Sequence, residues 1–147
     1  MRRFINYVAF FFVVALVGAQ AIRPERTNPP VAEARTIKRQ MSVPPAAGAV
    51  LERACRDCHS NRTDWPWYSH VAPVSWFVID HVNHGRSHLN FSEWSSYQPD
   101  RRRELVDGIC KQARDGTMPL PSYTWIHWSA RLSPADVNGL CSLSTAP

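Results

Sequence analysis

The feature that most constrains this chain is Cys55-Arg56-Asp57-Cys58-His59, two cysteines three positions apart with a histidine directly after the second. Two thiols at this spacing can form thioether bonds to the vinyl groups of one haem, and the adjacent imidazole can then bind its iron. The same cysteine pair also occurs as half of a zinc site or as a redox dithiol. The rest of the sequence has to separate these three interpretations.

Three further features favour haem. An N-terminal apolar stretch would export the chain to the compartment where c-type haem is attached, Met118-Pro119 lies downstream as a source of a second iron ligand, and no second Cys-x-x-Cys pair is present to complete a zinc site. We therefore predict one covalent haem c, attached through Cys55 and Cys58, with His59 as the proximal iron ligand.

The N-terminal stretch has two readings. Arg2 and Arg3 precede an apolar run over residues 4–22, which is typical of a segment that directs the following chain out of the cytoplasm. Ala19-Gln20-Ala21 has the small-x-small form of a signal-peptide cleavage site. As one uncleaved helix, residues 4–22 would reach about 28 Å, close to the hydrocarbon thickness of a bilayer, and this length favours a membrane anchor. Either outcome places the following domain on the periplasmic side of a bacterial inner membrane.

The chain length of 147 residues indicates one domain behind an N-terminal extension. Residues 1–22 are the signal peptide or anchor, residues 23–45 form a proline-rich linker that cannot build a regular helix, and residues 46–147 form the haem-binding domain. We expect a mostly α fold for this small domain.

Helical spacing and end signals predict four helices in this domain. A short helix over residues 46–54 would deliver the two cysteines, and a second would begin at Pro73 and end at Gly85. A third would begin at Pro99 and end at Gly116. A final helix follows Ser133-Pro134-Ala135-Asp136, a capping-box variant.

Met118 is the predicted distal iron ligand. It lies in Thr117-Met118-Pro119-Leu120-Pro121, and a loop stiffened by proline can hold a thioether at a fixed distance with little entropy to lose. The alternative is that Met118 only fills space in the loop. His127 is its rival as distal ligand, although a hydrogen-bonded structural histidine is the commoner case.

His81, His84 and His88 form a second cluster of chemically capable side chains. Neutral or solvated histidines are more common than metal ligands, so we do not predict a second metal site there. Of the three, His84 is the best placed to matter.

Cys110 and Cys141 remain once the haem pair is assigned. In an oxidising compartment, two leftover thiols on apolar helix faces predict a disulfide between the last two long helices, with buried free thiols as the alternative.

The charge balance gives little information about partners. The chain has 17 Lys and Arg against 12 Asp and Glu, and without Arg2 and Arg3 the excess is +3. The arginines are scattered except for residues 101–103, which fit a solvated helix face, so no nucleic-acid partner is predicted. An acidic redox partner is compatible with this charge.

The motifs together resemble the bacterial haem-binding domain family, small cytochrome c-like modules with an N-terminal membrane segment. The resemblance runs from residue 23 to the last helix and rests on these motifs: Cys55-Arg56-Asp57-Cys58-His59-Ser60-Asn61, Trp65-Pro66-Trp67-Tyr68-Ser69, Ala72-Pro73-Val74-Ser75-Trp76, Gly85-Arg86, Asn90-Phe91-Ser92-Glu93-Trp94, Gly116-x-Met118-Pro119 and Tyr123-x3-His127. It implies haem bound through Cys55, Cys58 and His59, with Met118 as distal ligand. It implies no particular reaction or partner.

Three functions follow from these expectations. The first is a one-electron carrier of a periplasmic or membrane redox chain, because an iron with both axial positions filled exchanges electrons without binding substrate. The second is a haem enzyme or gas sensor with an open iron position, for example a peroxidase-like protein assisted by His127 or His84. The third is a zinc-binding interaction module. The sequence favours the electron carrier over an enzyme.

Overall fold

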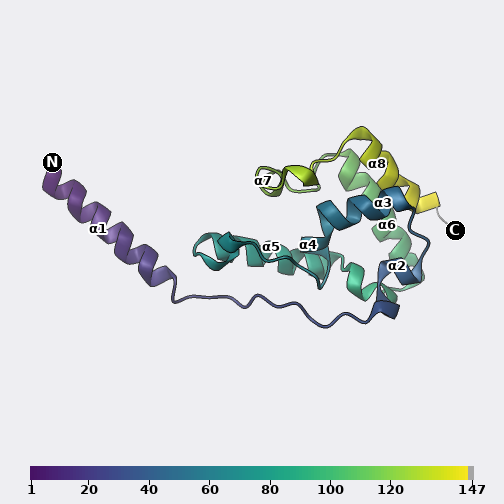
Figure 1. Cartoon of the computed structure of the whole chain (residues 1–147), viewed down its shortest axis with the longest axis horizontal. Helices are drawn as coiled ribbons and strands as arrows, with labels where there is room; N and C mark the ends of the chain where they lie inside the picture. The colour runs from purple at the N-terminus through teal and green to yellow at the C-terminus, as the bar shows by residue number, and fades with distance from the viewer. Residues whose placement is uncertain (146–147) are drawn as a thin grey trace.

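The computed structural model describes residues 1–145, and in that range the chain forms helices and no strand (Figure 1). The mostly α prediction is confirmed. The longer helices are α1 (Arg2–Ala19), α5 (Val74–His88), α6 (Pro99–Arg114) and α8 (Pro134–Cys141). The shorter ones are α2 (Ile37–Gln40), α3 (Pro45–Val50), α4 (Arg56–His59), α7 (Pro121–Thr124), η1 (Glu33–Arg35), η2 (Leu51–Cys55), η3 (Trp67–His70), η4 (Phe91–Ser96), η5 (Trp128–Ala130) and η6 (Ser142–Thr145).

Most buried apolar side chains gather in one core between α2, α3, α6, α8 and the short segments beside them. Trp94 of η4 and Leu140 of α8 are each 1% exposed and lie within it. Among the described residues, this core takes no side chain from α5, which buries Ile79 and Val82 separately. The domain therefore consists of a core lobe and a second part, the α5 lobe, made of η3 and α5.

α5 and α7 extend from the core lobe in the same direction. Figure 1 shows α5 reaching out from the core lobe along one side and α7 reaching out along the other, with α4 at the base between them. This arrangement places the predicted haem-attachment segment at the inner end of the space between α5 and α7.

Most of the predicted helix ends are confirmed. α6 begins at Pro99 and stops before Gly116, whose φ of 66° is the left-handed conformation that favours glycine at a helix end. α8 begins after Ser133, which forms the capping box with Asp136. One end was wrong: Gly85 does not terminate α5, which continues to His88. Gly85 is needed for close packing rather than for a turn.

α1 differs from the other helices because none of its residues is buried. It is the one helix among the described residues that is long and apolar enough to cross a membrane by length and composition. Figure 1 shows it projecting away from the rest of the chain.

The proline-rich segment after α1 is extended through residues 22–32, but it is attached to the domain over part of its length. The Gln20 side chain exchanges two hydrogen bonds with the backbone of Ala72, at 3.0 and 3.1 Å. Trp76 donates its indole N–H to the carbonyl of Ile22 at 2.8 Å. Contrary to the expectation of no regular helix, η1 and α2 form between Pro30 and Pro44, where the segment has no proline.

The predicted disulfide is confirmed: Cys110 of α6 is bonded to Cys141 of α8. The bond closes a loop with a sequence separation of 31 residues, and this loop contains Met118, α7 and His127. Removing such a link increases the conformational freedom of the unfolded chain.

We predict that replacing Cys110 and Cys141 together by serine lowers the free energy of unfolding by about 3 to 4 kcal/mol, the value expected for a loop of this length. Urea denaturation of the double variant and the native protein measures the difference. A thiol reductant should lower the urea midpoint of the native protein to that of the variant. Equal midpoints without reductant would contradict the prediction.

Candidate haem site

The attachment segment is one helical stretch in which α3, η2 and α4 follow each other from Pro45 to His59. As predicted, a helix delivers both cysteines, which are free thiols and half-buried. α4 ends where Ser60 turns to an extended conformation, with φ −148° and ψ 170°. The chain therefore leaves the segment immediately after His59.

The two thiols are poorly suited to redox exchange. Burial raises the pKa of Cys55 to about 12 and that of Cys58 to about 11. Redox dithiols need a thiol whose pKa is lowered, so that a thiolate is present at neutral pH. The structure thus gives the dithiol interpretation no support.

One ring nitrogen of His59 is hydrogen-bonded to backbone carbonyls, and the other is available to bind a metal. Its Nδ1 lies 3.0 Å from the carbonyl oxygen of Gly85 and 3.1 Å from that of Leu89, at the end of α5. Because carbonyls only accept, Nδ1 must carry the proton, and Nε2 then has the free lone pair that a metal needs. Burial lowers the pKa of His59, which also favours the neutral imidazole.

Gly85 allows this contact because it lets α5 approach the attachment segment. A Cβ atom added to Gly85 would clash with the carbonyl oxygen of Cys58 and would lie 3.0 Å from its carbonyl carbon and 3.1 Å from its Cβ. Any larger residue would push α5 away from Cys58. The same shift would move both carbonyl acceptors away from His59.

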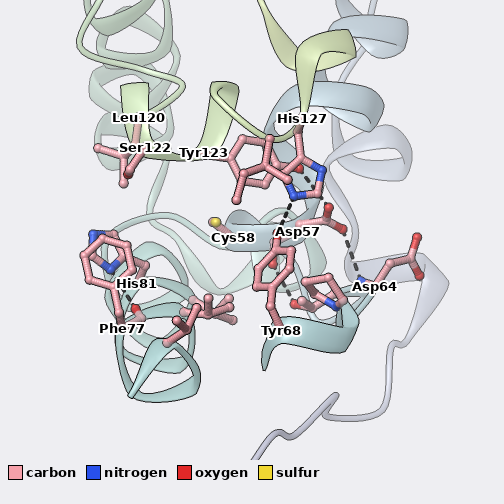
Figure 2. Close-up of a pocket in the computed structure, with 16 residues that line it drawn as sticks. Asp57, Cys58, Asp64, Tyr68, Phe77, His81, Leu120, Ser122, Tyr123 and His127 are labelled. Carbon is pink, nitrogen blue, oxygen red and sulfur yellow. Dashed lines mark hydrogen bonds between the residues drawn. The ribbon is translucent and has the colours of Figure 1, made fainter. Parts of the chain in front are cut away.

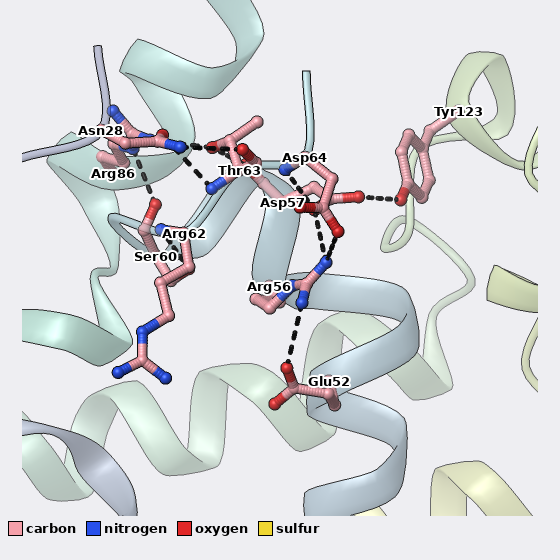
Figure 3. A network of polar contacts seen from close by, with 10 residues as sticks. All are labelled: Asn28, Glu52, Arg56, Asp57, Ser60, Arg62, Thr63, Asp64, Arg86 and Tyr123. Atoms are coloured by element: carbon pink, nitrogen blue, oxygen red, sulfur yellow. Dashed lines mark hydrogen bonds and ion pairs between the residues drawn. The ribbon is translucent and has the colours of Figure 1, made fainter. Parts of the chain in front are cut away.

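Arg86 fixes the same junction from the other side (Figure 3). Its Nε donates to the carbonyl of Ser60 at 2.7 Å and its Nη2 to the hydroxyl of Thr63 at 2.8 Å. The guanidinium also donates to the carbonyl of Thr27 at 2.7 Å and to the amide oxygen of Asn28 at 2.8 Å. One side chain of α5 therefore ties the turn after His59 to the linker. Sequence reasoning gave Arg86 no role, since its four acceptors come from distant parts of the chain.

A cavity lies next to Cys58, between the α5 lobe and the segment around α7 (Figure 2). Its α5 wall consists of Val74, Phe77, Val78, His81 and Val82, and its opposite wall of Leu120, Ser122, Tyr123, Ile126 and His127. Phe77 is 52% and Ile126 63% exposed, so both walls continue outwards as uncovered apolar surface. Such a slot suits a large, flat apolar group.

Two hydrogen-bonded pairs lie at one side of the cavity (Figure 2): one joins η3 to the segment after α7, and the other joins α7 to the attachment segment. The Tyr68 hydroxyl of η3 lies 2.6 Å from Nε2 of His127, and the Tyr123 hydroxyl donates to Oδ2 of Asp57 at 2.9 Å. The rings of Tyr123 and His127 are stacked, with centroids 4.2 Å apart. Burial, and then the charge of Asp57, raise the pKa of Tyr123, which keeps its hydroxyl protonated as a donor. Sequence reasoning missed the Asp57–Tyr123 pair, which joins residues 66 positions apart.

Asp57, which lines the cavity together with Asp64, is also part of a charged network at the attachment segment (Figure 3). Arg56 is paired with Asp57, Asp64 and Glu52, and the backbone N–H of Asp64 donates to Asp57 at 3.1 Å. The two residues between the cysteines therefore hold the following loop against the helix.

The structure gives the two distal-ligand candidates different surroundings. His127 lines the cavity, but its Nε2 already has Tyr68 as a partner, which is the hydrogen-bonded structural role. Met118 is 39% exposed and does not line the cavity, although Leu120, two residues later, does. Met118 as distal ligand therefore stays a prediction.

The histidines of α5 make local contacts. Nδ1 of His81 lies 2.8 Å from the carbonyl of Phe77, and Nδ1 of His84 lies 3.1 Å from that of Asp80, each one turn earlier. Within residues 1–145, no three or more His, Cys, Asp or Glu side chains are grouped to hold a metal ion. This gives the zinc alternative no support.

Together these features define a small helical domain with a site for haem: a Cys-x-x-Cys-His helix, an oriented neutral histidine and an apolar slot beside one of the thiols. The model of the haem-binding domain family matches residues 14–145, and the chain belongs to that family. Neither the curated proteins nor the solved structures that were searched gave a match.

The donor set fits a haem, with two free thiols and a neutral histidine on one helical stretch, and of these three residues Cys58 lines the cavity whereas Cys55 and His59 do not. The free Nε2 of His59 would be the iron ligand and the thiols of Cys55 and Cys58 would face the vinyl groups, while the apolar walls would cover the macrocycle. When bound, the group would supply an iron that cycles between two oxidation states. The residues of the chain orient the histidine and keep it neutral.

We predict that Gly85→Ala lowers the free energy of unfolding by about 1 to 3 kcal/mol, because the added methyl group overpacks the contact with Cys58. It should also lower the haem content per protein, measured by absorbance of the purified protein. Gly108→Ala in α6 is the matched control: its Cβ would meet no atom within 4 Å, so stability should rise by up to about 1 kcal/mol. Equal stability and haem content in the two variants would contradict the role given to Gly85.

Proposed function

We propose that this protein is a periplasmic monohaem c-type cytochrome-like electron carrier, held at the inner membrane through α1. The observation that carries the proposal is the pair of carbonyls at Nδ1 of His59, which leaves Nε2 as the metal-binding nitrogen directly after two free cysteines. Hydrogen bonds that the far ring N–H donates to carbonyl oxygens orient a ligand histidine and raise its basicity. In this proposal the haem is covalent, with His59 proximal and Met118 distal.

The architecture suits exchange of electrons at the slot. A thioether ligand favours reduced iron, and apolar walls limit the reorganisation of water when the charge of the iron changes. The partner would be another redox protein of the periplasm or the membrane. The mild positive charge of the domain fits an acidic docking surface on that partner.

A second candidate is a haem enzyme or gas sensor with an open iron position. It is favoured by one observation: Tyr68, Tyr123 and His127 line the cavity with polar groups, whereas Met118 does not line it. Hydroxyl and imidazole groups beside an open position could assist proton transfer to a bound ligand.

We predict that the haem remains with the polypeptide after denaturation and acid-acetone washing, and that Cys55→Ser with Cys58→Ser abolishes this retention. Two thioether bonds survive unfolding, whereas a coordinated haem is extracted. The pyridine haemochrome spectrum of protein made with an intact maturation system is the measurement. The Cys110→Ser with Cys141→Ser variant is the control and should keep its pigment. A colourless native chain would refute the proposal.

We also predict that Met118→Ala removes the methionine-to-iron charge-transfer band of the oxidised protein and allows the reduced protein to bind carbon monoxide. Met41→Ala is the control, because Met41 packs against the core lobe and should leave the spectrum unchanged. If Met118→Ala also leaves the spectrum unchanged, and the native reduced protein binds carbon monoxide, the open-position candidate is the correct one.

A further inference from the structure

Three exposed tryptophans are direct sequence neighbours of residues that line the slot, namely Tyr68, Ile126 and His127. Trp67 is 78% exposed, Trp125 73% and Trp128 71%. None of the three lines the cavity. Large apolar side chains grouped on a surface indicate a contact with something outside the chain.

These tryptophans lie in two segments, η3 and residues 125–128, that a hydrogen bond joins beside the cavity. The rings of Trp67 and Tyr68 are in contact at 5.8 Å between centroids, and Tyr68 is bonded to His127, the residue before Trp128. The indole of Trp128 donates to the carbonyl of Trp125 at 2.8 Å. We call Trp67, Trp125 and Trp128 the tryptophan rim.

The rim lies where the chain leaves α1. Gln20, the residue after α1, forms two hydrogen bonds with the backbone of Ala72, which lies two residues after the end of η3. Arg26 donates to the carbonyl of Ser69 within η3 at 3.0 Å. Figure 1 shows the tips of both lobes on the side of the domain from which α1 departs. The hydrogen bonds of residues 20–28 to the domain hold the end of α1 in a fixed position relative to η3.

The chemistry of the rim matches a bilayer surface. Tryptophan is enriched at the membrane–water interface, where its apolar ring and its N–H are both satisfied. Arg23 and Arg26 follow α1 with Glu25 between them, and the Arg131 guanidinium lies 5.2 Å from the centroid of the Trp128 ring. The excess of positive charge beside the rim complements anionic lipid headgroups.

We infer that the tryptophan rim rests on the headgroup region of the membrane that α1 enters, so that the open end of the slot faces the bilayer. The inference rests on the proposed anchoring by α1 and extends the proposed function: the slot would exchange electrons with a partner at or within the membrane. The occupant of this surface is therefore lipid, with anionic headgroups beside the arginines.

The test uses the full-length haem-loaded protein in nanodiscs of phosphatidylcholine and phosphatidylglycerol that contain a trace of lipid with a diazirine near its headgroup. After irradiation, peptides are mapped by mass spectrometry. We expect lipid adducts on the peptides that contain Trp67 and residues 125–128, and at least several-fold fewer on α6. Adducts confined to α1, or equal labelling of α6, would overturn the inference.

Two variants with the same change of charge sharpen the test. Trp125→Asp with Trp128→Asp should lower the labelling of residues 121–131 several-fold, because carboxylates leave the headgroup region. Arg39→Asp, on the exposed side of α2 in the core lobe, should leave it unchanged. Equal labelling of residues 121–131 in the two variants would contradict the contact between the tryptophan rim and the lipid headgroups.

The same samples separate this inference from the proposed function. Intact mass shows whether residues 1–22 are retained, and a cleaved chain would overturn the inference. The haemochrome spectrum reports the haem independently. A red protein with an unlabelled rim refutes the lipid contact alone, whereas a colourless protein with a labelled rim refutes the haem and leaves the lipid contact in place.

Discussion

The close contact between α4 and α5 at Gly85 is the interaction on which the site depends. It brings the carbonyls of Gly85 and Leu89 to the Nδ1 atom of His59 and the guanidinium of Arg86 to Ser60 and Thr63. One short stretch of α5 thereby sets the protonation and the orientation of the histidine. It also fixes the position of the α5 residues that line the cavity, because they belong to the same rigid helix.

The two lobes are joined by polar contacts and by the attachment segment rather than by a shared core. The apolar core lies in the core lobe, while Tyr68 with His127 connects η3 to the segment after α7, and Asp57 with Tyr123 connects α4 to α7. A domain of this size has little apolar surface to bury, so a large apolar group between the lobes would contribute much of the missing contact. This explains why the slot continues into exposed apolar side chains such as Phe77 and Ile126.

The linker belongs to the same unit as the site. Arg86 contacts Thr27 and Asn28 as well as the turn after His59, and Gln20 is bonded to Ala72 at the start of the α5 lobe. The position of α1 is therefore connected to His59 through one side chain and a few backbone groups. In the proposed function, this connection gives the slot a defined orientation relative to the membrane.

The sequence by itself determined the features that depend on neighbouring residues: the Cys-x-x-Cys-His segment, the apolar α1, the ends of α6, and the capping box of α8. It also identified the Cys110–Cys141 pair, because two cysteines remained once the haem pair was assigned. The tertiary structure decided that Gly85 lies inside α5, that Arg86 ties the linker to the site, and that Tyr123 and Tyr68 hold Asp57 and His127. These contacts join residues 23 to 66 positions apart, and no local spacing encodes which distant oxygen a side chain will meet.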